Sequence, residues 1–153
     1  MRSVLRSIAA VVVGFIAASI VMMIVETING RVLYPELAKA AEGLKDPAQL
    51  GALFAKAPLG AMVMVIVGWI LGGIAGGWTT ARIVARGAIG HSLVLGGLLT
   101  LAGVANNLMI PKPLWFWVVS LIVLIPAAYL GARLGSKRQA SSSSSAASGS
   151  DGH

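Results

Sequence analysis

PLGAMVMVIVGWILGGIAGGWTTAR, residues 58–82, is the stretch that decides the fold. No charged side chain occurs between Leu59 and Trp78. At a rise of about 1.5 Å per residue, a helix over these positions is long enough to cross a hydrocarbon core of about 30 Å. The sequence therefore predicts a membrane-spanning helix at about residues 58–81.

Small residues recur at four-residue intervals within this span. Gly68, Gly72 and Gly76 form one ridge, and Gly73 and Gly77 form a second ridge beside it. Such spacing lets helix backbones approach closely, and close packing drives helix association in lipid. The two ridges predict one neighbouring helix inside the chain and one outside it. The other glycines with this predicted packing role are Gly14, Gly131 and Gly135.

The composition excludes an ordinary soluble domain. Of the 153 residues 57% are hydrophobic and only 11% are charged, with a mean hydropathy of +0.86, whereas soluble domains carry roughly 25% charged residues. The net charge is +7, but the basic residues flank apolar runs, so we expect them to set topology and to bind no nucleic acid. No cysteine is present, which excludes disulfides and thiolate chemistry.

Three further apolar runs predict spans at about residues 6–28, 88–109 and 114–134. We interpret the first as an uncleaved helix, because its apolar run is longer than the ~7–15 residues of a signal-peptide core. Pro111 and Pro113 predict a tight turn between the last two spans. The predicted fold class is an all-α membrane protein, a four-helix transmembrane bundle over residues 1–135.

Two segments are predicted to lie outside the bundle. In the loop at residues 29–57, Asp46 followed by Pro47 predicts a helix N-cap, and we expect two short interfacial helices. A lid over a ligand is the alternative interpretation of this loop. Residues 136–153 are rich in serine and predict a flexible tail.

The distribution of basic residues predicts the orientation. Five basic residues lie on the side of the long loop, spread among acidic ones, and seven crowd the span ends on the other side. The positive-inside rule then places both termini in the cytoplasm. The seven are Arg2, Arg6, Arg82, Arg86, Arg133, Lys137 and Arg138.

Glu26 is the leading candidate for a functional side chain. A carboxylate at the end of a span is either an interfacial group bonded to nearby amides or a proton or cation site. Asn106 and Asn107 end the third span at the same depth, so a small polar cluster with Glu26 is predicted at the outer edge.

His91 lies near the opposite edge, where we expect an interfacial or packing role. Imidazole titrates near neutral pH, so His91 is retained as a further candidate in a polar or proton site. Because Glu26 and His91 lie at opposite ends of the spans, they cannot assemble a catalytic triad. The sequence therefore predicts no enzyme, no catalytic residue, no cofactor and no metal site.

Two motifs carry a family resemblance. GWxxGGxxGGWxxAR, residues 68–82, and NLMIPxPxWFW, residues 107–117, resemble those of uncharacterised small bacterial four-span inner-membrane proteins. The resemblance covers most of residues 1–135 and implies a bacterial inner-membrane location without an activity.

The functional hypothesis is a non-catalytic accessory subunit or a homo-oligomeric structural component. Its expected partners are membrane lipids and other transmembrane helices, from copies of itself or from a larger complex. A small-solute or ion transporter or channel is the alternative. A lipid-binding or membrane-shaping role for the surface helices is a third hypothesis.

Overall fold

The described part of the chain is entirely helical. The computed structural model describes residues 2–84 and 86–148, with side chains placed for residues 4–84 and 86–136. Within these ranges the chain forms α-helices and one π-helical segment, without strands. Four of the helices are long: α1 (Arg2–Ile28), α4 (Leu59–Ile83), α5 (Ala88–Met109) and α6 (Leu114–Ser148).

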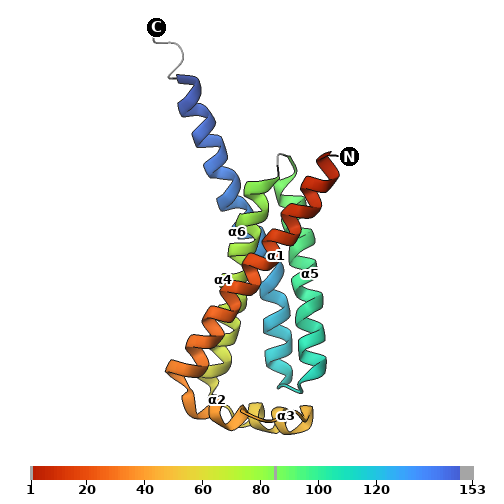
Figure 1. Cartoon of the computed structure of the whole chain (residues 1–153), viewed down its shortest axis with the longest axis vertical. Helices are drawn as coiled ribbons and strands as arrows, with labels where there is room; N and C mark the ends of the chain where they lie inside the picture. The colour runs from red at the N-terminus through yellow and green to blue at the C-terminus, as the bar shows by residue number, and fades with distance from the viewer. Residues whose placement is uncertain (1, 85, 149–153) are drawn as a thin grey trace.

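The long helices form a bundle, and each contains a segment long and apolar enough to cross a membrane. These segments are Val4–Leu33, Leu59–Ile83, Ala88–Met109 and Leu114–Ser136. Helix α1 begins, and α6 ends, at the same end of the bundle (Figure 1). The arrangement is consistent with a multi-pass membrane protein.

Helix α4 is the centre of the bundle, and its first glycine ridge faces α1. A Cβ atom at Gly76 would lie 2.7 Å from the carbonyl oxygen of Gly14, and one at Gly72 would lie 2.8 Å from that of Ala18. At Gly68 it would lie 3.2 Å from Cβ of Val25. The α1 and α4 backbones therefore approach closely at Gly72 and Gly76, because these positions of α4 carry no side chain.

The second glycine ridge of α4 faces α6. A Cβ at Gly73 would lie 2.8 Å from that of Ala127, and one at Gly77 would overlap the carbonyl oxygen of Ala128. Gly131 and Gly135 of α6 pack in return against the α4 backbone near Ile74 and Trp78. Both ridges thus have partners inside the chain, so they supply no argument for the external helix that the sequence suggested.

Buried hydroxyl groups add hydrogen bonds between helices. Thr80 Oγ1 of α4 donates to the carbonyl oxygen of Ala10 at 3.2 Å, and Ser92 Oγ of α5 donates to that of Gly77 at 3.1 Å. Both side chains are fully buried. Their polar groups are therefore satisfied within the bundle.

Two short helices, α2 (Pro35–Ala41) and α3 (Pro47–Ala55), lie across the other end of the bundle (Figure 1). We call them the α2–α3 layer. Gly43, with φ of 80°, lies in the turn between them, and Asp46 Oδ1 accepts from the Ala48 N–H at 3.0 Å, which confirms the expected N-cap. The layer contacts the α5–α6 turn, because a Cβ at Gly51 would lie 3.0 Å from Pro111.

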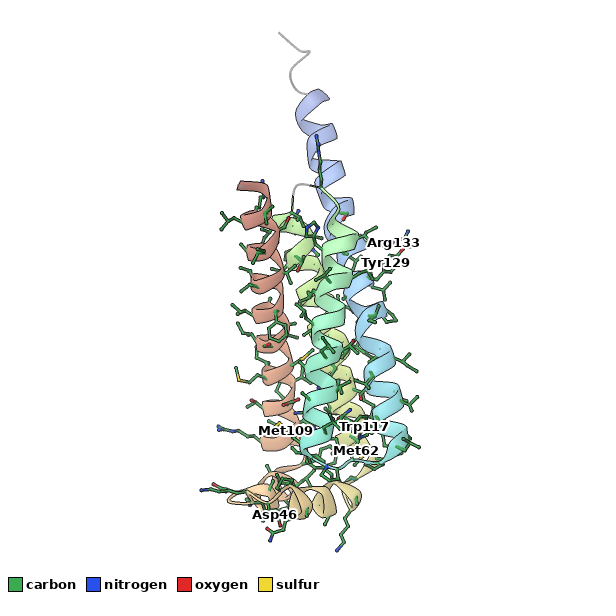
Figure 2. The ribbon with its side chains drawn as sticks, turned by 90° about the vertical axis from the view of Figure 1, so that its right-hand side faces the viewer. Asp46, Met62, Met109, Trp117, Tyr129 and Arg133 are labelled. Atoms are coloured by element: carbon green, nitrogen blue, oxygen red, sulfur yellow. The ribbon has the colours of Figure 1, made fainter. Side chains whose placement is uncertain are left out.

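Figure 2 shows how the ends of the spans relate to this layer. Met62, Met109 and Trp117 lie at one level of the bundle, close to the layer that contains Asp46. Arg133 and Tyr129 lie toward the opposite end, where the guanidinium group stands 5.9 Å from the ring centroid. The bundle therefore has two distinct ends, one covered by the α2–α3 layer and one rich in arginine.

Two helices extend beyond the boundaries expected from sequence. After α1 the chain continues as a π-helical segment, η1 (Asn29–Leu33), closed by a 2.8 Å hydrogen bond from the Tyr34 N–H to the Asn29 carbonyl oxygen. The fourth span was expected to end at Leu134, whereas α6 is helical to Ser148, since a formed helix extends more easily than a new one begins. The flexibility of the tail at 136–153 stays a prediction, and residues 149–153 lie outside the described residues.

The glycine contacts predict that one added methyl group has opposite effects on two helices. Gly77→Ala should lower stability by about 1–3 kcal/mol, because the new Cβ would overlap the α6 backbone. Gly97→Ala is the matched control, since a Cβ there has nothing within 4 Å and should stabilise α5 by up to about 1 kcal/mol. Unfolding of both variants in detergent measures this, and equal stability would contradict the assigned packing.

Candidate functional site

A cavity of about 280 Å³ lies between the bundle and the α2–α3 layer, and we call it the end cavity. Every helix of the described chain contributes to its lining. Its volume is near the lower limit of the ~300–1,000 Å³ found for small-molecule sites. Its polar lining includes Glu26, Asn29, Tyr34, Asn106 and Lys112.

Lys112 brings a positive charge into the cavity from the α5–α6 turn. Its ammonium group donates to Oδ1 of Asn106 and, at 3.2 Å, to Oδ1 of Asn107. It also lies 5.7 Å from the ring centroid of Phe54 and 5.3 Å from that of Phe116. The ammonium group is therefore held between two amide oxygens and two aromatic rings.

The surroundings of Lys112 disfavour its charged form. Partial burial lowers the pKa of Lys112 below its ordinary value of 10.5, and the negative charge of Glu26 opposes this shift. Burial removes water from the ammonium group, whereas a nearby carboxylate stabilises it. The burial effect is the larger of the two, so the net shift of the Lys112 pKa is downward.

Asn29 lines the cavity and carries an unused hydrogen-bond acceptor. Its side chain is 7% exposed, and its Nδ2 group donates to the carbonyl oxygen of Ala61 at 3.0 Å. Its Oδ1 atom is buried and accepts no hydrogen bond from the part of the chain that the structure describes. A buried acceptor without a donor costs roughly 1–3 kcal/mol, so a ligand that donates to this atom would recover that cost.

Tyr34 and Glu26 complete the polar part of the cavity. The Tyr34 hydroxyl packs so closely over Gly60 that a Cβ at that position would overlap it. The side chain of Glu26, near the end of α1, is exposed and makes no hydrogen bond or ion pair with the described residues. Its carboxylate therefore remains available to a ligand in the end cavity.

Apolar side chains form the remaining walls. Trp69 packs edge-to-face on Phe116 with ring centroids 6.1 Å apart, and both rings are nearly fully buried. Phe54 and Leu53 of α3 line the side formed by the α2–α3 layer. The end cavity thus combines a charged, polar part with an aromatic and aliphatic part, as an amphipathic ligand would require.

A second, apolar hollow of about 370 Å³ lies between α1 and α5, and we call it the mid-helix hollow. Val11, Val12, Phe15 and Ile16 of α1 line it, with Leu98 and Ala102 of α5. It reflects a limited contact between these helices, because α1 packs mainly on α4. Helices α1 and α5 contribute residues to both hollows.

The structure brings together part of the polar cluster expected from sequence. Glu26 and Asn106 line the same cavity, but Asn106 bonds to Lys112 and has no hydrogen bond to the carboxylate. Asn107 does not line the cavity: it is 1% exposed and its Nδ2 donates to Ser120 Oγ at 3.4 Å. The sequence suggested that the two asparagines would contact Glu26. In the structure they accept hydrogen bonds from Lys112 instead.

His91 lies at the arginine-rich end, away from this site. Its Nδ1 atom is 2.9 Å from the carbonyl oxygen of Gly87, the residue before α5. It therefore lies at the start of α5 and takes no part in the end cavity. Among residues 2–84 and 86–148, no group of three or more His, Cys, Asp or Glu side chains is placed to hold a metal ion.

Sequence reasoning missed Asn29, Tyr34, Trp69 and Lys112 as members of one site. Lys112 lies in a turn, and Trp69 lies within a long apolar run, where no binding role was predicted. One signal was available: Asn29 and Lys112 both lie on the loop side of the predicted topology, where Glu26 had been placed.

Comparison with protein-family models, with curated proteins and with solved structures finds no match to this chain.

Burial lowers the pKa of Lys112 and the charge of Glu26 raises it, so a substitution at Glu26 should change this pKa. Glu26→Gln removes the negative charge that favours the ammonium form, so the pKa of Lys112 should fall further below 10.5. NMR titration of the Lys112 side chain in detergent micelles measures this shift. Glu36→Gln is the control, because Glu36 pairs with Lys39 at 3.1 Å outside the cavity. An unchanged or raised pKa in Glu26→Gln would contradict the coupling.

Proposed function

We propose that this chain is a non-catalytic multi-pass membrane protein that binds an amphipathic ligand in the end cavity. The observation that carries this proposal is the lining of that cavity. It combines a positive charge on Lys112, a carboxylate on Glu26 and an unused acceptor on Asn29 with an aromatic wall. The α2–α3 layer then acts as an interfacial cover over the ligand, as in the alternative interpretation of the loop.

The packing of the bundle favours binding over transport. Beyond Trp69 the bundle is filled by a core cluster that includes Ala18, Leu95, Leu99 and Leu124. The buried hydroxyls of Thr80 and Ser92 are already bonded to backbone carbonyls. A permeating ion needs replacement ligands along its route, and the described core offers few. The small-solute or ion transporter or channel therefore remains the weaker proposal.

The positions of the titratable groups support a role without catalysis. Glu26 lies in the end cavity, whereas His91 lies at the opposite end of α5. A general base must reach the group it deprotonates within about 3 Å, or through one water molecule. The side chains that line the end cavity therefore suit holding a ligand more than transforming one.

A subunit role in a larger or homo-oligomeric assembly is the second candidate, and a specific observation favours it. Helix α5 has an open side, because Cβ atoms at Gly90 and Gly97 would have nothing within 4 Å. Large apolar side chains on the same helix, Val94 and Leu101 among them, are more than half exposed. Another transmembrane helix or lipid tails would cover this side in a membrane.

The cavity can be filled without altering its polar groups. Val65→Phe adds an aromatic ring to the wall of the end cavity and should reduce the amount of ligand that co-purifies by about tenfold or more. Val63→Phe is the matched control, since Val63 on the same helix is 44% exposed and does not line the cavity. Native mass spectrometry of gently extracted protein measures bound ligand and subunit number together.

Equal ligand retention by the two phenylalanine variants would contradict the binding proposal. A monomer that co-purifies with no other protein would contradict the second candidate.

We also propose that both termini are cytoplasmic and that the membrane is the inner (cytoplasmic) membrane. Arg6, Arg82 and Arg133 lie at the end of the bundle where α1 begins, opposite the α2–α3 layer. The positive-inside rule favours the cytoplasm for that end. A fluorescent reporter fused to the C-terminus should fold and emit, and protease added outside spheroplasts should cleave only within residues 29–57. Cleavage of the C-terminal reporter from outside would contradict this orientation.

A further inference from the structure

We propose that the end cavity and the mid-helix hollow together form one lipid site, for a lipid with a phosphoethanolamine head group. The head group occupies the end cavity, and one acyl chain lies in the hollow between α1 and α5. This inference rests on the proposed function and names the ligand class of the same site. It is drawn from four features: an unused acceptor, a carboxylate, an ammonium group with one remaining N–H donor, and an apolar hollow.

The acceptor and the carboxylate define the cationic part of the head group. Asn29 Oδ1 is buried and lacks a donor within the described chain, and Glu26 lines the same cavity without an ion pair there. A primary ammonium group carries three N–H donors and a positive charge. It can donate to Oδ1 of Asn29 and pair with the Glu26 carboxylate, so it satisfies both groups.

The ammonium group of Lys112 defines the anionic part. Of its three N–H donors, two bond to Oδ1 of Asn106 and of Asn107. One N–H donor of the ammonium group remains, next to the aromatic rings of Phe54 and Phe116. A phosphate oxygen accepts such a bond, and charge-assisted bonds are stronger than neutral ones. Lys112 and Glu26 carry opposite charges, which complement a zwitterion.

The mid-helix hollow accounts for the acyl chain. Its lining on α5 ends at Ala102, only four residues before Asn106 of the end cavity, which corresponds to about 6 Å along the helix. On α1 the separation from Ile16 to Glu26 is ten residues, or about 15 Å. An acyl chain can cross this interval, and the hollow is lined entirely by apolar side chains. A head group alone would leave this hollow unexplained.

The same groups discriminate between lipid head groups. A choline group carries a positive charge but no N–H donor, so Oδ1 of Asn29 would stay unpaired. A glycerol head group donates through its hydroxyls but brings no positive charge to Glu26. Leaving a buried polar group unpaired disfavours a ligand strongly. The site is therefore expected to rank ethanolamine above both other head groups.

The test compares lipids that share the same acyl chains and differ only in head group. Dissociation constants for the phosphoethanolamine, phosphocholine and phosphoglycerol lipids are measured by native mass spectrometry on delipidated full-length protein. Wild type should bind the ethanolamine lipid about tenfold more tightly than the choline lipid, because one charge-assisted bond is lost with choline. Glu26→Gln should reduce the preference for the ethanolamine lipid over the glycerol lipid to below about threefold, because the lipid ammonium group loses its ion-pair partner, whereas Glu36→Gln should preserve that preference.

A second pair of variants tests the acyl chain. Leu98→Trp places an indole in the mid-helix hollow and should weaken all three long-chain lipids about equally, with the head-group preference retained. Leu101→Trp is the matched control, because Leu101 is 67% exposed and does not line the hollow. Equal losses in both tryptophan variants would overturn the placement of the chain.

The outcomes separate this inference from the proposed function. Equal affinity for the three head groups, together with weaker binding in Val65→Phe, would overturn the ethanolamine assignment and leave an amphiphile site. Failure of all three lipids to bind wild type, with no effect of Val65→Phe on co-purified ligand, would overturn the proposed function itself. Tighter binding of the glycerol lipid would show that Lys112 dominates and would overturn the role given to Glu26 and Asn29.

Discussion

The close approach of backbones on two sides of α4 is the constraint on which the rest of the structure depends. Gly72 and Gly76 leave α4 bare where it meets the carbonyls of α1, and Gly73 and Gly77 do the same toward α6. In lipid, apolar side chains gain little by leaving one neighbour for another, so dispersion contacts between bare backbones must hold helices together. A single methyl group on either ridge of α4 would separate the helices.

This constraint also determines where the bundle is open. Because α1 follows the first ridge of α4, its contact with α5 is limited, and α6 occupies the second ridge. The mid-helix hollow lies between the two helices that the glycines do not join, and the end cavity lies where these helices reach the α2–α3 layer. Four other pairs of long helices pack more closely than α1 and α5, and the mid-helix hollow lies between these two.

Burial of the polar groups that line the end cavity lowers the stability of the fold, and the packing of the bundle does not require these groups to be there. Lys112 is partly withdrawn from water, and Asn29 has a buried oxygen without a donor in the described chain. Burying polar groups without partners lowers stability. Hydrogen bonds to Asn106 and Asn107 offset this cost for Lys112, and the hydrogen bond from Asn29 Nδ2 to the Ala61 carbonyl oxygen offsets it for the Asn29 amide nitrogen. Both Lys112 and Asn29 line the end cavity, and a ligand bound there is the explanation that we propose for them.

The sequence by itself determined the four long apolar helices, the turn at Pro111 and Pro113 and the N-cap at Asp46. Each depends on neighbours a few residues apart, through apolar run length, fixed proline geometry and local hydrogen bonding. The sequence also placed Glu26, Asn106 and Lys112 on one side of the predicted topology, but it did not specify their partners.

Only the tertiary structure decided how the helices pair and what the end cavity contains. Glycine spacing shows that a helix has bare sides, yet Gly73 and Gly77 could have met any helix, and the packing of Ala127 and Ala128 selects α6. In the same way Lys112, rather than Glu26, takes the two asparagines, because the α5–α6 turn directs its side chain toward them. Such pairings join residues distant in the chain, and no local pattern encodes the distance between their atoms.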